Sequence, residues 1–168
     1  MQLPKLSLRL ALGCLPLLGL LAACSSDTVT PDTTDYAAKD EAALKQYIAD
    51  QKITNAQRQP SGLYFVPDSV NASLPLLKAG QKVSVLYTGQ LLNGQVFDAS
   101  SQHGNQVFTF TLGAGQVITG WDLGVPLMHK GDKARLLIPS ALGYGASAVG
   151  TIPAHSPLVF TIRVKDAQ

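Results

Sequence analysis

Aromatic and large apolar side chains recur in six short segments in the second half of this sequence. Aromatic residues make up only 7% of the chain, yet most of those beyond residue 60 lie within these segments. Ring faces supply large apolar contact areas and can wall a site for a flat apolar group. The pattern therefore predicts an aromatic-walled pocket built from segments 85–89, 96–98, 108–110, 117–121, 142–145 and 158–160.

The residues needed for covalent or proton-transfer catalysis are not gathered anywhere in the sequence. His103, His129 and His155 are isolated from one another, and no two carboxylates form a close pair beyond the N-terminal segments. Residues 145–149 lack the final glycine of a nucleophile elbow, and no metal-ligand spacing is present. We therefore expect no cofactor and no metal. The missing base and nucleophile also disfavour a hydrolase.

Residues 1–23 have the composition of a cleaved secretion signal. Lys5 and Arg9 precede a leucine-rich run that is too short to span a membrane as a mature helix. The run ends in Leu-Ala-Ala-Cys, which resembles the bacterial lipobox, whose cysteine is lipidated and becomes the first mature residue. We predict lipidation at Cys24; the alternative is an ordinary small-residue cleavage site followed by a chance cysteine.

Removal of this leader would change the chemistry of the mature chain. Cys14 is lost and Cys24 is acylated, so no thiol remains for a disulfide, a metal site or a nucleophile. Loss of Lys5 and Arg9 leaves 11 basic and 11 acidic side chains, a balance that gives no electrostatic reason for nucleic-acid binding. A lipoprotein cysteine normally receives several acyl chains, which anchor a protein stably, whereas a single chain does so only marginally. We therefore expect attachment to the membrane through Cys24. The expected location is the bacterial cell envelope, either the outer membrane facing the periplasm or the cell surface.

Residues 24–36 and 37–60 are the next two parts of the predicted organisation. The first is rich in Ser, Thr, Asp and Pro, cannot bury enough surface to offset chain entropy, and is expected to be a flexible tether. The second begins with a helix over about 37–52, capped by Asp35 or Asp40 and ended near Thr54. This helix is too short for a dimerising stalk, so we expect a monomer in which it leans on the following domain. Its narrow apolar stripe contains Ala43, Leu44, Tyr47 and Ile48.

Residues 61–168 consist of short β-rich runs broken by Gly, Pro, Asn and Ser, which indicates a mainly β domain. Apolar and polar residues alternate along several runs, as in a sheet with one buried face. Asn93-Gly94 predicts a two-residue hairpin turn, and the one helical stretch, about 117–128, is shortened by Gly124 and Pro126. Strands are expected at about 62–66, 82–91, 106–112, 133–139 and 158–165.

Five linked motifs in this order make residues 61–168 resemble the FKBP-type peptidyl-prolyl cis-trans isomerases. The motifs are Tyr87-Thr88-Gly89, Asn93-Gly94 with Phe97-Asp98-Ala99-Ser100, Val117-Ile118 with Gly120-Trp121, Tyr144-Gly145, and Ile152-Pro153 followed by Leu158-Val159-Phe160. The resemblance implies an α+β fold, in which an FKBP-like antiparallel β-sheet curls around one short α-helix, here with an extra N-terminal helix. That extra helix is similar to the leader helix of some bacterial lipoprotein members.

The resemblance also implies which residues form the site. Asp98, Tyr144 and the backbone of Ile118 would be the catalytic groups, with the indole of Trp121 as the floor of the pocket. A prolyl ring is apolar and has no N–H, so aromatic faces can enclose it without leaving a donor unpaired. Each aromatic taken singly is better explained by core packing, and Phe110 competes with Phe108 on the same strand face. The implied walls are Tyr87, Phe97, Phe108, Val117, Ile118, Ile152 and Phe160.

The implied activity is rotation about X-Pro bonds in extracytoplasmic proteins, which assists their folding. Catalysis would come from desolvation of the amide in an apolar pocket and from hydrogen bonds to nearby carbonyls. The implied partners are proline-containing unfolded or partly folded polypeptides, together with macrolide inhibitors. The alternative is a lipid-anchored proline-peptide-binding module or holdase chaperone with little turnover, against which the presence of Asp98, Tyr144 and Trp121 favours an enzyme.

Overall fold

The N-terminal helix α1 spans Tyr36–Asp50 in the computed structural model, which describes residues 34–168. Its cap is Asp35, whose side chain accepts a hydrogen bond from the Ala38 N–H at 3.1 Å. The predicted helix is confirmed, although it ends a few residues before the predicted stop at Thr54.

The predicted signal peptide 1–23, the lipidation site Cys24 and most of the tether 24–36 lie outside the described residues. Among residues 34–168, no helix combines the length and the apolar composition needed to cross a membrane.

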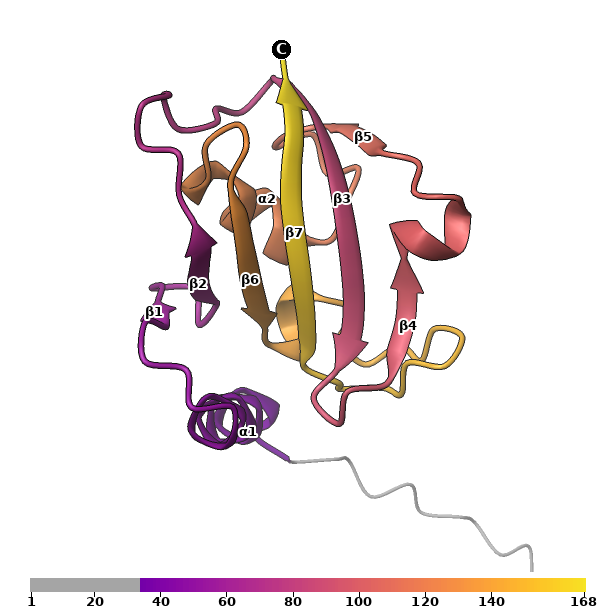
Figure 1. Cartoon of the computed structure of the whole chain (residues 1–168). Helices are drawn as coiled ribbons and strands as arrows, with labels where there is room; N and C mark the ends of the chain where they lie inside the picture. The colour runs from indigo at the N-terminus through magenta and orange to yellow at the C-terminus, as the bar shows by residue number, and fades with distance from the viewer. Residues whose placement is uncertain (1–33) are drawn as a thin grey trace, which may run out of the picture. The chain divides into compact units, whose positions relative to one another are not determined.

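Antiparallel strands form one sheet in the order β1-β2-β6-β7-β3-β4, with β5 paired to β3 outside this path. The long strands β3 and β7 run side by side at the centre of Figure 1, and α2 lies behind the sheet. The strands are β1 (Gln57–Arg58), β2 (Tyr64–Ser69), β3 (Lys82–Leu91), β4 (Val96–Ala99), β5 (Phe108–Thr111), β6 (Lys133–Ile138) and β7 (Leu158–Ala167). The helices after α1 are α2 (Thr119–Gly124) and the short 3₁₀ turns η1 (Ser100–His103), η2 (Val125–Leu127) and η3 (Ser140–Leu142).

The five predicted strands are present, with boundaries that differ from the prediction by up to three residues. Strand β2 starts later than predicted because Gly62 adopts a left-handed φ of 87° and donates its N–H to the Gln59 carbonyl at 3.0 Å. Strand β1 was not predicted. Both of its residues are exposed, and only their pairing with β2 defines them as a strand.

The hairpin between β3 and β4 forms, but its turn has three residues where two were predicted. The Leu91 N–H donates to the Gln95 carbonyl, and the Gly94 N–H donates to the Leu91 carbonyl, both at 2.9 Å. Gly94 has a φ of 87°, whereas Asn93 is not at positive φ. Gly94 therefore takes the left-handed position of a three-residue loop, which returns the chain directly into β4.

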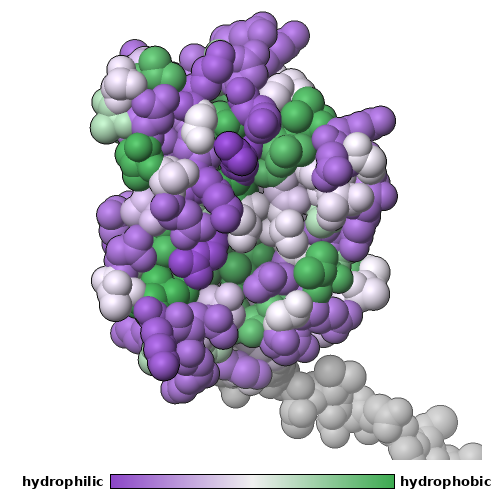
Figure 2. All heavy atoms as spheres, in the orientation of Figure 1, coloured by the Kyte–Doolittle hydropathy of each residue, from purple (hydrophilic) through white to green (hydrophobic). Residues whose placement is uncertain are grey.

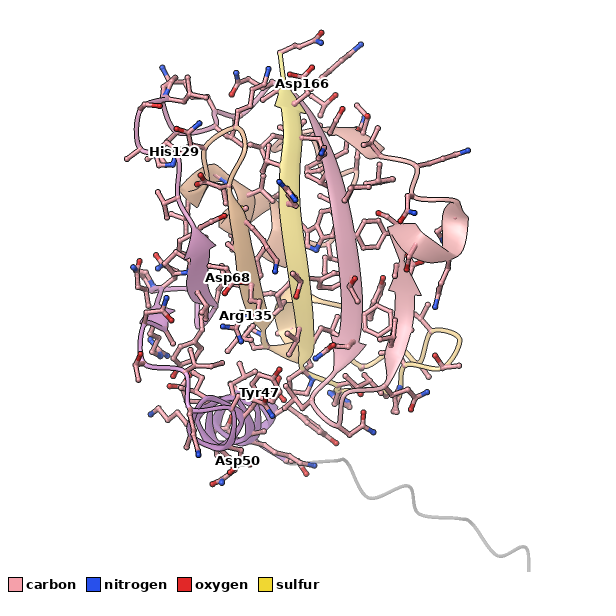
Figure 3. All side chains as sticks on the ribbon, viewed as in Figure 1. Tyr47, Asp50, Asp68, His129, Arg135 and Asp166 are labelled. Atoms are coloured by element: carbon pink, nitrogen blue, oxygen red, sulfur yellow. The ribbon has the colours of Figure 1, made fainter. Side chains whose placement is uncertain are left out.

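Alternation along β6 and β7 distributes their side chains over two faces of the sheet. The paired residues Leu136 and Phe160 point into the main core, while Leu137 and Val159 point to the other face. Hydrophilic side chains cover most of the face turned to the viewer in Figure 2. On that face Arg135 of β6 pairs with Asp68 of β2 at 3.2 Å (Figure 3). The prediction of one buried face is thus incomplete, because part of the second face is also covered.

Helix α2 packs closely on β6 because two of its residues have no side chain. A Cβ atom at Gly120 would lie 2.5 Å from a side-chain carbon of Ile138, and one at Gly124 would lie 2.6 Å from Leu136. Pro126 lies in the 3₁₀ turn η2 that ends the helix, as the sequence predicts. This close approach holds Trp121 of α2 against the core, where it is 4% exposed.

Helix α1 covers part of the second face of the sheet. Leu44 is fully buried in a cluster with Tyr64, Val66, Leu137 and Val159. Tyr47, which lies between α1 and the sheet in Figure 3, packs against the same cluster. The expectation that the helix leans on the following domain is therefore confirmed.

A polar network at the edge of this cluster centres on Glu41 of α1. Its carboxylate accepts hydrogen bonds from Arg58 Nε at 2.9 Å and from the Tyr64 hydroxyl at 2.7 Å, and it pairs with Lys45 at 3.2 Å. The hydrogen bond from Arg58, opposed by partial burial and aided by Tyr64 and Lys45, lowers the pKa of Glu41 to about 2.

This lowered pKa predicts an acid-dependent contribution of Glu41 to stability. The stabilisation is complete above the usual pKa of 4.5 and is lost as the pH falls toward about 2. Denaturant titrations should show a wild-type advantage over Glu41→Gln that is steady near neutral pH and shrinks between these two values. An advantage of constant size down to about pH 2 would contradict the assignment.

Candidate active site

A cavity of about 470 Å³ opens on the core side of the sheet, a size typical of small-molecule sites. Strands β3, β4, β5 and β7 and helix α2 contribute to its lining, together with the loops that precede α2 and follow η3. The lining residues are Tyr87, Asp98, Phe108, Gly115, Gln116, Val117, Ile118, Trp121, Tyr144 and Phe160.

The aromatic rings of the cavity pack edge to face around Trp121. The ring centroids of Tyr87 and Phe160 lie 5.4 and 5.2 Å from that of Trp121, at interplanar angles of 76° and 90°. Phe108 meets the indole at 6.2 Å and 79°. The indole Nε1 is buried and has no hydrogen-bond partner among the described residues. The floor and walls thus form one interlocked aromatic unit, in the geometry that aromatic pairs prefer.

Eight of the ten predicted site residues line this cavity, and Phe97 and Ile152 do not. The Phe97 ring lies edge to face on Phe160, with centroids 5.5 Å apart, in space left free by the missing side chain of Gly89. Ile152 is 5% exposed in the main core, because a tight turn pairs its backbone with that of Val149 at 2.9 Å. Both residues pack on the core beside this lining, and their predicted role in substrate binding stays a prediction.

Strand β5 carries both phenylalanines that the sequence left in competition. Phe108 is 41% exposed and lines the cavity, whereas Phe110 is 2% exposed and lies in the core. Their rings stack with centroids 5.9 Å apart at 22°, so the buried ring supports the exposed one.

Two lining residues, Gly115 and Gln116, were not predicted from the sequence. The carboxylate of Asp122 in α2 accepts the N–H groups of Gly113 and Gly115 at 2.9 and 3.1 Å. The Gln116 side chain accepts the Thr111 N–H at 2.8 Å. These bonds fold the turn onto the cavity. Asp122, the fourth residue of α2, was the signal in the sequence that could have indicated them.

Asp98 forms the polar edge of the cavity together with two partners. Its Oδ2 accepts the Tyr87 hydroxyl at 2.6 Å, and its Oδ1 accepts a hydrogen bond from His103 Nε2 at 2.9 Å. The sequence analysis described His103 as isolated from the other two histidines and did not pair it with Asp98. The 3₁₀ turn η1 follows β4 directly, and this turn brings residue 103 back over residue 98. The Tyr87 backbone is held as well, since its N–H donates to the Oγ of Ser100 at 3.0 Å.

The protonation states at this edge follow from burial and from these bonds. Burial acts to raise the pKa of Asp98, but the hydrogen bonds from Tyr87 and His103 outweigh it and hold the pKa below its usual value. Burial raises the pKa of Tyr87, and the hydrogen bond to Asp98 raises it further. Burial and the charge of Asp98 also raise the pKa of Tyr144. At neutral pH the cavity edge therefore carries one carboxylate and two neutral phenols that can donate hydrogen bonds.

Ile118 and Tyr144 both line the cavity, from the loops that precede α2 and follow η3. Ile118 immediately precedes α2 and its carbonyl accepts the Trp121 N–H at 2.9 Å. The first N–H groups of a helix have no partner within the helix, so the backbone N–H of Ile118 is placed to donate outward. Tyr144 follows η3, is half-buried and lines the cavity.

Comparison with known proteins agrees with this geometry. The family profile described as FKBP-type peptidyl-prolyl cis-trans isomerase matches residues 75–165. FK506-binding protein 2 of Dictyostelium discoideum is 43% identical over 104 residues, covering 61% of this chain and 75% of the relative. FK506-binding protein 4 of Mycosarcoma maydis is 45% identical over 105 residues, which cover 62% of this chain and only 27% of that relative.

Two solved structures share the fold. FkpA from Escherichia coli superposes with a TM-score of 0.68 and 32% identity, covering 79% of this chain and 61% of that one. AtFKBP13 superposes with a TM-score of 0.62 and 37% identity, covering 67% of this chain and 98% of the other. The antiparallel sheet with one short helix is common to these proteins, which confirms the predicted fold. With a family profile that spans more than half of its length, this chain belongs to the FKBP-type peptidyl-prolyl cis-trans isomerase family.

Proposed function

We propose that this protein is a peptidyl-prolyl cis-trans isomerase that binds the prolyl ring of a polypeptide in the aromatic cavity. The observation that carries the proposal is the cavity itself, an aromatic enclosure with hydrogen-bond donors at its edge. The substrates are proline-containing unfolded or partly folded polypeptides, and FK506-type macrolides are candidate inhibitors because the relatives are named for binding FK506.

Rotation about an X-Pro bond requires no bond to break. The barrier, roughly 18 to 20 kcal/mol, reflects the loss of amide resonance at the twisted geometry. A twisted amide has less charge separation than a planar one, so an apolar enclosure favours it relative to the ground state. Each 1.36 kcal/mol of such preference raises the rate about tenfold. In this mechanism Trp121 and the surrounding rings act by excluding water from the amide.

Hydrogen bonds at the cavity edge then hold the polypeptide in place. The Ile118 N–H and the Tyr144 hydroxyl donate to carbonyls that flank the proline. Both oxygens of Asp98 already accept hydrogen bonds, from Tyr87 and His103. This occupancy supports a role for Asp98 in orienting the Tyr87 ring.

A protease-coupled isomerisation assay on a proline tetrapeptide tests the activity directly. We expect the purified protein to accelerate the slow cis-to-trans phase in proportion to its concentration. Peptide binding without acceleration would refute the isomerase and support the binding module or holdase.

Conversion of Tyr144 to phenylalanine tests how much the edge hydroxyl contributes. Desolvation is the main term in this mechanism, so we expect kcat/KM to fall by well under the roughly 100-fold typical of a lost oxyanion donor. Tyr47→Phe removes a hydroxyl from α1, outside the cavity lining, and should leave kcat/KM unchanged. A loss near 1,000-fold in a folded Tyr144→Phe protein would refute desolvation as the main term.

We further infer that the protein is a bacterial lipoprotein of the cell envelope that acts on extracytoplasmic clients. The support is the charged, leucine-rich leader that ends in Leu-Ala-Ala-Cys at Cys24. Ser25, in place of aspartate, after the cysteine is compatible with the outer membrane. A monomer is supported by α1, whose apolar stripe packs on its own domain. Mass spectrometry of the mature N-terminus would detect an acylated Cys24, and an unmodified terminus would refute the anchor.

A further inference from the structure

Helix α1 makes a buried polar contact that its apolar packing does not require. Asp40 is 2% exposed, and its Oδ2 accepts hydrogen bonds from both the N–H and the hydroxyl of Ser140, at 2.7 and 2.6 Å. Ser140 is also 2% exposed and begins the turn η3, 100 residues further along the chain. Burial of a carboxylate is unfavourable unless hydrogen bonds replace the lost water. An apolar contact would dock the helix at least as well, so this polar contact calls for another purpose.

The carbonyl of Ser140 continues the contact toward the cavity. It accepts the N–H of Gly143 at 2.9 Å and the N–H of Gly145 at 2.8 Å. These two N–H groups lie on either side of Tyr144 in the chain. The backbone that carries the Tyr144 ring is therefore held by the same residue that Asp40 holds.

The distal end of this loop also contacts α1. The carbonyl of Gly145 accepts the His155 N–H at 2.7 Å, and His155 has a φ of 54°. The imidazole of His155 stacks on the ring of Tyr36, the first residue of α1, with centroids 3.5 Å apart and planes 8° apart. Segment 140–155, which brings Tyr144 to the cavity, is thus held against the helix near both of its ends.

We propose that α1 is a positioning element of the isomerase site, and that Asp40 acts through Ser140 to place the Tyr144 hydroxyl at the cavity edge. Asp40 lies outside the cavity lining, so it is a positioning residue and has no contact with substrate. The proposal rests on the proposed function, in which the Tyr144 hydroxyl holds a substrate carbonyl. Buried hydrogen bonds of this kind hold the groups that they support in one geometry.

A double-mutant cycle on the full-length chain tests the route from Asp40 to Tyr144. We expect Asp40→Ala to lower kcat/KM about fivefold in wild type and to have no further effect in the Tyr144→Phe background. Asp40→Asn keeps the shape and one acceptor oxygen, so it should restore part of the activity. Multiplicative losses from Asp40→Ala and Tyr144→Phe would overturn the proposal, because they would show that the residues act independently.

The matched control is Glu41→Gln, on the neighbouring residue of the same helix. Glu41 ties α1 to Arg58 and Tyr64 and makes no hydrogen bond to segment 140–155. We expect this variant to lose some stability while its kcat/KM stays at the wild-type value, measured well below the unfolding transition of every variant. Equal losses of kcat/KM in Glu41→Gln and Asp40→Ala would show that helix docking in general is what matters, and would overturn the specific role of Asp40.

A second readout does not depend on turnover and so separates this proposal from the proposed function. Amide hydrogen exchange of Gly143 and Gly145, followed by NMR, reports the two bonds to the Ser140 carbonyl. Both amides should exchange faster in Asp40→Ala, and in Asp40→Asn if the alanine variant fails to fold, but not in Glu41→Gln. Unchanged exchange in a folded Asp40 variant would overturn the proposal. A wild-type protein without turnover would instead refute the proposed function alone.

Discussion

Replacement of Trp121 by alanine is expected to lower both stability and turnover, with the largest combined loss of any substitution in the site. The indole is 4% exposed and contacts the rings of Tyr87, Phe108 and Phe160. Truncation of a buried tryptophan to alanine costs about 3 to 5 kcal/mol of unfolding free energy. The cavity also loses its floor, so water reaches the bound amide and the preference for the twisted geometry falls. Denaturant unfolding and the tetrapeptide assay measure the two losses separately.

Two further variants separate the floor of the cavity from general packing. Leu123→Ala changes an exposed residue of the same helix, and it should leave unfolding free energy and kcat/KM close to wild type. Trp121→Phe keeps an aromatic face in the core and should recover more activity than alanine does. Wild-type turnover in a folded Trp121→Ala protein would contradict the desolvation mechanism.

Gly89→Val should cause the second large loss, although valine is a far better strand residue than glycine. A Cβ atom at position 89 would lie 2.6 Å from a ring carbon of Phe97 and 2.7 Å from one of Phe160. Both rings are held by neighbouring strands that pair with β3, so they cannot move apart without disturbing the cavity wall. We expect a loss of about 3 kcal/mol in unfolding free energy, at the upper end for overpacked cores. Because Phe160 lines the cavity, KM for the tetrapeptide should rise as well.

Gln90→Val is the matched control, since it introduces the same side chain one residue later, on the opposite face of β3. Its unfolding free energy should stay within about 0.5 kcal/mol of wild type. If Gly89→Val proved as stable as Gln90→Val, the aromatic wall would have to be more deformable than its packing indicates.

Local patterns were enough to predict much of this fold. Strand β3 has the boundaries that the sequence predicts, and α1 and the β3–β4 hairpin are in their predicted places. Each of these elements is specified by residues that are close in the chain: alternating apolar residues, good helix formers with an aspartate cap, and a glycine that tolerates positive φ.

Features that depend on contacts across the sheet were harder to predict. Strand β1 exists only through its pairing with β2, and no alternation marks it in the sequence. Phe97 follows the predicted hairpin turn and Phe160 lies in a predicted strand, yet only Phe160 is in the cavity lining. The two rings pack against each other in the space beside Gly89, a contact between three strands that no local pattern reveals. Asp40 could be interpreted only as a helix cap, because its partner lies 100 residues away in sequence.

Trp121 is the only tryptophan in the chain, and its ring forms part of the cavity surface. The intrinsic fluorescence of the whole protein at indole wavelengths therefore originates at this single place. Its emission reports the polarity beside the bound ligand, and no added label is needed. Ligand affinity and chain unfolding can consequently be followed optically on the unmodified protein, with the same probe for both.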